Sequence, residues 1–414
     1  QTATITGTLT DSVSSDTTTS NIRIQAKANA DNNRITEVNE SNGVGAVSIT
    51  KKAGGEPVLF NARRYHGNET PRDINGIGFQ PDLIWIKHRV NTSSGGTGGT
   101  GAEPHILFDS VRTVGHGLTT SANSASAEEP YGKAKPIADG FNLFDGTHGT
   151  YPDAWTNWAS RGYVAWCWKA GGSPVSIANN ASGVSNATNI TQSASPTSGF
   201  SITKFTGSGA GVEFPHGLSG TPEFMIVKDL DDGNRSWVVY HKDLTSITKY
   251  LVLSNAEDEG DIGESNGVSN GFIAPTNSLI KLGTDNSWAG DSSHSYICYA
   301  WKAVPGVSAF GKYEGNSSGY ASNGDGGVSG LSFKPRFVMV KGIDSDSRQW
   351  VIHDAFRVAS DTKTSNLYAN LDLTDDTDSG HAIEFHSDGF RFNTNSTYVS
   401  INNNDETYIY VAFA

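Results

Sequence analysis

A seven-residue aromatic segment occurs three times in the chain, and its third copy forms the last seven residues. The copies read YVAWCWK at 163–169, YICYAWK at 296–302 and YIYVAFA at 408–414. The wide separation of the copies indicates repeated units larger than a single strand or hairpin. Each copy alternates bulky apolar residues with mostly small ones, which is typical of a strand with two different faces. We therefore expect each copy to be a buried strand that closes one repeat.

Further matches surround each copy in the same order. A pattern of Gly, an apolar residue, a spacer, Pro and an apolar run ending in Lys occurs at 78–87, 217–228 and 330–341. Related segments follow at 105–112, 237–244 and 350–357, and the segment at 138–144 matches 387–393, whereas the middle copy offers both 269–272 and 278–283. These intervals are domain-sized, so they exclude a solenoid of short repeats.

Composition favours strands over helices in these repeats. Gly accounts for 47 residues, charged residues make up only 18%, and helical periodicity is weak. We predict an all-β fold of three tandem antiparallel β-sandwich repeats, jelly-roll or lectin-like, preceded by a small β-rich N-terminal segment. The predicted boundaries are 1–56 for the N-terminal arm, 57–172 for repeat 1, 173–198 for a polar linker, 199–304 for repeat 2 and 305–414 for repeat 3.

The two cysteines fall within copies of the aromatic segment. Cys167 and Cys298 lie on the face that carries mostly small residues, whereas Trp166 and Trp168 lie on the bulky face. Two thiols in a chain of this length are no disulfide framework, and a zinc site needs more ligands at suitable spacing. We expect both cysteines to be compact apolar fillers.

Charge and hydropathy restrict the partners. The formal net charge is −13, which lacks the cationic footprint that nucleic-acid binding needs. No apolar run is long enough to span a membrane, so we expect no membrane insertion. The chain starts at Gln1 rather than Met, so we expect either that preceding residues were removed or that the sequence is part of a longer product.

Two acidic loops are the candidate metal sites. The segments DLDDGN at 229–234 and DSDS at 344–347 follow the repeated lysines. The weak Ca²⁺ candidates are Asp229, Asp231, Asp232, Asp344 and Asp346. The order of an EF-hand fails because Gly233 stands where a ligand is needed, so we expect solvated turns, with an occasional Ca²⁺ site as the alternative. The corresponding loop at 91–104 has one acid and a long Gly-rich insertion.

No residue is assigned a catalytic or cofactor-binding role. The Gly-rich segment at 206–211 lacks the Gly-Lys-Ser/Thr of a phosphate loop, and no Gly-x-Ser-x-Gly elbow occurs. Paired carboxylates for glycoside cleavage cannot be located from sequence alone. We expect structural hydrogen bonding for the histidines His66, His105, His216, His241 and His353.

The combined repeat motifs resemble a known group of proteins. The segments GFQPDLIWIK, HILFDSVR, YVAWCWKAGG, PEFMIVK and KPRFVMVK, taken together over about 58–414, are similar to repeat-containing, tail-fibre-like virion surface proteins of marine and cyanobacterial tailed phages. That family has no assigned function and no assigned catalytic residues. The resemblance implies a virion setting, such as a tail fibre, another exposed appendage or a protein that decorates the capsid.

The leading hypothesis is therefore a non-enzymatic phage virion protein, a fibre or surface appendage that contacts a host glycan or protein. One alternative is a capsid decoration or filament subunit, assembled with copies of itself or other virion proteins through a strand in residues 1–12. A second alternative is a glycan depolymerase. We expect a homo-oligomer at the extracellular virion surface, with no nucleic-acid partner.

Overall fold

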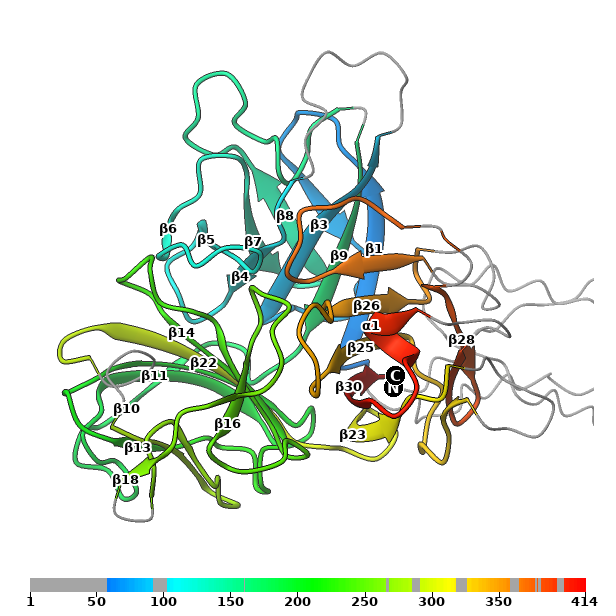
Figure 1. Ribbon diagram of the computed structural model, residues 1–414. Helices are drawn as coiled ribbons and strands as arrows, with labels where there is room; N and C mark the ends of the chain where they lie inside the picture. Colours follow the sequence, from blue (N-terminus) through cyan, green and yellow to red (C-terminus); the bar gives the residue numbers. More distant parts are fainter. Residues whose placement is uncertain are drawn as a thin grey trace, which may run out of the picture. The chain divides into compact units, whose positions relative to one another are not determined.

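The computed structural model confirms an all-β chain with antiparallel pairing in every ladder between named strands. It describes residues 58–91, 103–159, 161–265, 268–284, 291–317, 326–357, 365–376, 378, 381–392 and 398–414. The N-terminal arm predicted at 1–56, including its assembly strand at 1–12, lies outside these residues. So does most of the Gly-rich insertion at 91–104. Figure 1 shows the strands of the three repeats coloured along the sequence.

Repeat 1 consists of a six-stranded sheet and a three-stranded sheet. The large sheet has the order β1 (Phe60–His66), β9 (Arg161–Trp168), β3 (Leu83–Asn91), β4 (Ile106–Asp109), β5 (His116–Thr119) and β6 (Ala127–Glu128). The small sheet has the order β2 (Arg72–Asn75), β8 (Gly140–Phe144) and β7 (Lys133–Ile137). The closing segment is therefore β9, a central strand between β1 and β3.

Repeat 2 has the same plan with additional strands. Its large sheet has the order β10 (Val175–Ile177), β11 (Thr188–Ser195), β12 (Phe200–Thr206), β22 (Ser295–Trp301), β14 (Phe224–Asp229), β15 (Val238–His241), β16 (Lys249–Val252) and β17 (Gly260–Asp261). The small sheet has the order β13 (Val212–Pro215), β21 (Leu279–Leu282) and β20 (Phe272–Ile273), and β18 (Glu264–Ser265) pairs with β19 (Val268–Ser269).

Repeat 3 repeats the plan once more. Its large sheet has the order β23 (Ser308–Glu314), β30 (Thr407–Phe413), β25 (Phe337–Gly342), β26 (Val351–Asp354) and β27 (Asn366–Tyr368). The small sheet has the order β24 (Gly327–Val328), β29 (Gly389–Phe392) and β28 (Ile383–His386), and the helix α1 (Val399–Asn402) precedes β30. Within the described part of the chain, no helix has the length and hydropathy of a membrane span.

The predicted linker at 173–198 is wrong. Strands β10 and β11 lie in this segment, and β11 pairs along most of its length with β12, so the segment extends the sheet of repeat 2. Its Ser, Thr and Asn content hid this pairing, because an exposed edge of a sheet tolerates polar side chains.

The structure also shows which segment of repeat 2 corresponds to 138–144 and 387–393. Strand β21 pairs with β13 as β8 pairs with β2, so 278–283 is the structural match.

The closing strands have the two faces that the sequence predicts, but the faces serve different cores. The small face, including Cys167 and Cys298, points into the core between the two sheets of its own repeat. Both thiols are free and fully buried. The bulky face packs into a cluster that we call the central core, which contains residues from all three large sheets.

The central core joins the closing strands of all three repeats. Trp168 lies 6.5 Å from Trp301 and 5.6 Å from Phe413, measured between ring centroids, and Trp301 lies 6.5 Å from Phe413. A cavity of about 20 Å³ at this point is lined by apolar side chains from each repeat. The three sandwiches therefore share the central core in addition to the core of each repeat, and Leu59–Ala414 forms one compact unit.

Hydrogen bonds between repeats follow a cyclic order. The indole of Trp237 in repeat 2 donates to the carbonyl of Thr119 in repeat 1 at 2.9 Å, and Trp350 in repeat 3 donates to Val252 in repeat 2 at the same distance. His105 is the residue of repeat 1 at this position, and Thr120, whose N–H donates to the carbonyl of His105, donates its hydroxyl to the carbonyl of Ala369 in repeat 3 at 2.5 Å. Equivalent groups thus contact the next repeat in turn, the relation expected of an approximate threefold rotation.

A second set of contacts follows the same cycle. In repeat 2, Tyr299 of the closing strand donates to Asp109 of repeat 1 at 2.6 Å, and Trp166 of repeat 1 donates to Asp354 of repeat 3 at 3.0 Å. The His241 ring of repeat 2 meets the carbonyl of Tyr410 in repeat 3 at 3.2 Å. These bonds supply partners for polar groups that the central core removes from water.

We predict that a chain ending at Asp405 loses cooperative folding in all three repeats. The truncation removes β30, which pairs with both β23 and β25, and it takes Ile409, Val411 and Phe413 out of the central core. Each large apolar side chain lost from a core costs about 3 kcal/mol. Thermal unfolding followed by tryptophan fluorescence tests this, with a chain ending at Phe413 as the control. Retention of the native transition by repeats 1 and 2 would contradict the shared core.

Candidate functional site

The acidic loop after β14 is held by its own carboxylates. Asp229, which is 1% exposed, accepts hydrogen bonds from the backbone N–H groups of Asp231 and Asp232 at 2.8 and 2.9 Å. Asp232 in turn accepts from the backbone N–H of Asn234 at 2.8 Å. These are Asx turns, in which a carboxylate replaces a backbone acceptor. The predicted Ca²⁺ ligands of this loop are therefore already engaged in building the turn.

Acids of both loops bond to the start of a closing strand, Asp231 in repeat 2 and Asp344 in repeat 3. Asp231 accepts the N–H of Ser295 at 2.7 Å, and Asp344 accepts the N–H of Thr407 at 2.5 Å. Both bonds tie the loop to the first residue of a closing strand. Asp346 accepts the N–H of Asp258 in repeat 2 at 3.2 Å. The structure keeps the five candidates in two separate loops, each serving local or inter-repeat hydrogen bonding.

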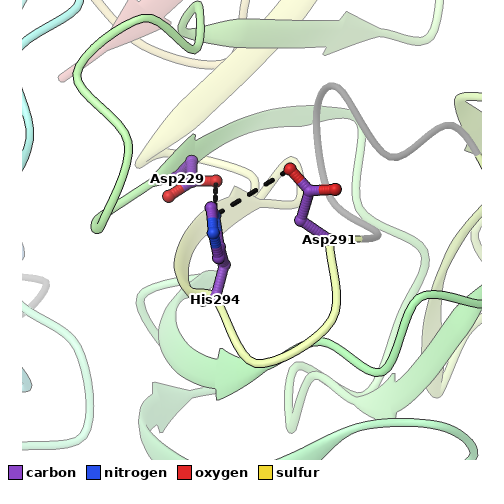
Figure 2. A group of neighbouring side chains, drawn as sticks. All are labelled: Asp229, Asp291 and His294. Atoms are coloured by element: carbon purple, nitrogen blue, oxygen red, sulfur yellow. Dashed lines mark hydrogen bonds and ion pairs between the residues drawn. The ribbon is translucent and has the colours of Figure 1, made fainter.

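Asp229 also belongs to a cluster that the sequence analysis did not identify (Figure 2). Nδ1 of His294 lies 2.8 Å from a carboxylate oxygen of Asp229 and 3.9 Å from one of Asp291. These three residues offer ligand atoms within 4.8 Å of one another. His294 immediately precedes β22 and Asp291 lies three residues earlier, so a His near the start of a closing strand was the available sequence signal.

Arg235 already supplies positive charge to this cluster. Its guanidinium lies 2.8 Å from Asp291 and 3.3 Å from Asp232. The hydrogen bond to Asp229 raises the pKa of His294, which favours the charged imidazolium. One imidazole and two carboxylates suit a borderline cation such as Zn²⁺ better than Ca²⁺, which prefers oxygen ligands alone. As built, however, the group is a network of ion pairs.

The other repeats have ion pairs at the same positions. In repeat 1, Arg161 lies 2.7 Å from Glu103, and in repeat 3 Glu406 lies 2.5 Å from Arg348. Arg161, His294 and Glu406 all come just before the closing aromatic segment, so the signs of the pair are exchanged between repeats 1 and 3. The hydrogen bond from Arg348 lowers the pKa of Glu406 to about 2. The cluster of repeat 2 is thus one version of a recurring structural brace.

A buried ion pair marks two of the three inter-repeat contacts. Asp109 pairs with Arg112 at 2.5 Å, and Asp354 pairs with Arg357 at 2.6 Å, with all four side chains at most 2% exposed. Repeat 2 has His241 and Leu244 at these positions. Both charges are absent there together, which avoids the large cost of leaving one buried charge without its partner.

The three repeated lysines are fully buried, which the sequence pattern did not predict. Their ammonium groups donate to backbone carbonyls. Lys87 reaches Glu103 at 2.6 Å and Asp372 of repeat 3 at 3.0 Å, whereas Lys341 reaches Glu257 of repeat 2 at 2.6 Å. The Lys228 ammonium stays within its own loop, 2.6 Å from the carbonyl of Asp229. Two of the three lysines therefore connect repeats.

Burial lowers the pKa of each of these lysines, because the charged ammonium loses its hydration. The pKa falls to about 7 for Lys87 and Lys341, and to about 8 for Lys228, against opposing contributions from nearby carboxylates. A lysine with a lowered pKa is a candidate nucleophile or base. Since these ammonium groups donate to main-chain carbonyls and the three side chains are fully buried, their role in this fold is structural.

The buried histidines for which the sequence predicts hydrogen bonding make structural contacts. His105 accepts a hydrogen bond from the Trp85 indole at 2.8 Å, and His216 accepts one from the N–H of Leu218 at 3.1 Å. Burial lowers the pKa of His241 to about 4 and of His353 to about 3, so both are neutral at neutral pH. The expectation of structural roles is supported for His105, His216 and His241.

Comparison with known proteins identifies a family. Residues 57–414 match the family model described as "Domain of unknown function (DUF7483)", so the chain belongs to this family. The match covers all three repeats and begins after the predicted N-terminal arm. Searches of curated proteins and of solved structures found no significant match.

We predict that Lys341→Met flattens the dependence of stability on pH. The folded-state pKa is about 7 and the unfolded value about 10.5, so between these values the unfolded chain binds more protons. Stability therefore rises with pH across this window, by up to about 5 kcal/mol for Lys341. Met removes that contribution, so the free energy of unfolding of the variant should climb less steeply in denaturant titrations at successive pH values.

Lys312→Met is the matched control, because Lys312 is exposed on β23. It should leave the pH dependence of unfolding as it is in the parent chain. Equal slopes for Lys341→Met and the parent chain would show that Lys341 stays charged and well compensated throughout the window.

Proposed function

We propose that this DUF7483 chain is a non-enzymatic structural protein of a tailed-phage particle, a fibre or surface appendage exposed on the virion that contacts the host cell. In this proposal residues 59–414 form the exposed head, and the preceding segment, including residues 1–12, attaches the head to other virion proteins or to copies of itself. The family match adds no activity to this proposal, and the virion setting rests on the resemblance of the repeat motifs.

The central core is the observation that supports a binding scaffold best. It joins the large sheets of all three repeats through aromatic packing, and the two cyclic sets of hydrogen bonds hold the repeats in register. A rigid framework of this kind presents loops in fixed positions, and loops on rigid scaffolds are where binding residues concentrate. Weak contacts from several loops then add through multivalency.

The polar groups that first suggested chemistry support a structural role. The acids of the two loops cap backbone groups, the buried ion pairs lie at contacts between repeats, and the repeated lysines bind main-chain carbonyls. Each of these groups already has a hydrogen-bond or ion-pair partner within the fold. The net charge of −13 keeps an exposed head soluble and disfavours contact with nucleic acid.

Labelling of intact particles tests the location. We expect antibodies raised against residues 59–414 to label a tail appendage of the phage that encodes the chain, seen by electron microscopy. The purified chain should bind host cells and reduce phage adsorption in proportion to its concentration. Labelling spread over the capsid would favour a decoration protein, and an absence of labelling together with no effect on adsorption would overturn the proposal.

We also predict that the folded chain needs no Ca²⁺. The loop carboxylates are satisfied by internal N–H groups and by Arg235, so chelation with EDTA should leave the midpoint of thermal unfolding unchanged. A bound ion at saturating concentration would add about 3 kcal/mol. A midpoint that rises with Ca²⁺ in the parent chain and not in Asp291→Asn would establish a metal site instead.

A further inference from the structure

A column of aromatic rings in repeat 1 is built from Tyr131, which lies between β6 and β7, and from four residues of the segment between β8 and β9. Tyr131 stacks on His148 with ring centroids 4.8 Å apart, and His148 stacks on Tyr151 at 5.5 Å. Trp155 meets Tyr131 at 4.7 Å, and Trp158 meets Tyr151 at 5.4 Å. Tyr151 is 44% exposed, and the other four rings are half-buried. We call these five residues the aromatic column.

Hydrogen bonds fix the backbone that carries the column. The N–H groups of His148 and Trp155 donate to the carbonyls of Pro130 and Tyr131, at 2.9 and 2.8 Å. The imidazole of His148 accepts the N–H of Tyr151 at 3.0 Å. The rings are therefore placed before any ligand arrives, which lowers the entropic cost of binding. Trp155 and Trp158 also pack against the core between the two sheets of repeat 1, whereas Tyr131, His148 and Tyr151 belong to neither core.

Carboxylates lie in the same segment. Asp153 is 3% exposed, and its Oδ1 makes no hydrogen bond within the described residues. Burial, together with the neighbouring carboxylates of Glu69 and Asp145, raises its pKa to about 6. A buried polar atom without a partner is rare in a folded protein and often marks a place where water or a ligand binds.

The charges beside the column restrict what it can hold. Two cations in this region already have carboxylate partners: Arg161, which acts on Asp153, pairs with Glu103, and Lys133, two positions after Tyr131, pairs with Glu128. The remaining field is negative, which disfavours phosphate, sulfate and acidic sugars. A neutral saccharide fits both features, since its C–H groups pack on aromatic surface while its hydroxyl groups donate to carboxylates.

We propose that the aromatic column with its flanking carboxylates is a binding site for a neutral saccharide. The inference deepens the proposed function and rests on it in one respect, namely that a glycan on the host surface is the natural occupant. The described residues of the equivalent segments in repeats 2 and 3 contain no comparable column; repeat 3 has a single tyrosine there, Tyr398, stacked on His381. The site belongs to repeat 1.

Ligand-observed NMR on the full chain tests this site, with the methyl glycosides of glucose, galactose, mannose and N-acetylglucosamine as probes. We expect saturation transfer to at least one probe, and we expect Tyr151→Ala to weaken that binding about fivefold or more. Tyr398→Ala, which removes the stacked tyrosine of repeat 3, is the matched control and should leave binding unchanged. Circular dichroism checks that both variants are folded.

Three results would overturn the site: no transfer to any of the probes, equal transfer with the parent and Tyr151→Ala, or competition by choline, which would indicate a quaternary-ammonium site. These outcomes are separable from failure of the proposed function. A chain that binds saccharide through Tyr151 but neither labels particles nor affects adsorption keeps the site and loses the virion role. Particle labelling without saccharide binding keeps the virion role and rules out the saccharide site.

Discussion

The packing of three closing strands against one another is the interaction on which the rest of the structure depends. Trp168, Trp301 and Phe413 meet in the central core, each from an interior strand of a large sheet. Because the core draws on all three repeats, it removes more apolar surface from water than separate sandwiches do. Burial of apolar surface is the main favourable term in folding. The polar contacts between repeats follow from this packing.

Those polar contacts show how a chain satisfies groups that its core has buried. Indoles, a tyrosine and two lysines each donate to a neighbouring repeat, and the two buried Asp–Arg pairs lie where closing strands arrive. Since a buried donor or charge without a partner costs several kcal/mol, these contacts select one arrangement of the repeats over others that bury similar area. The same reasoning accounts for the joint loss of both charges in repeat 2.

The residues proposed to bind a ligand are distinct from the central core and from the polar contacts between repeats. The loop acids, which the sequence offered as Ca²⁺ candidates, are used by the fold, and the cysteines are the buried fillers that the sequence predicted. The aromatic column was not noticed in the sequence, because Tyr131 lies 20 positions before Tyr151 and only the folded segment stacks their rings. Surface loops of this kind place recognition groups on a framework that the central core keeps rigid.

The sequence by itself determined the β class, the three repeats and the two faces of the closing strand, because alternation and repetition are local properties that survive in the order of residues. Tertiary structure alone decided which core each face enters, the burial of Lys87 and Lys341, and the conversion of residues 173–198 from an expected linker into strands. Which side chains meet across repeats depends on how sheets pack in space, and a pattern confined to one strand contains no information about its distant partners.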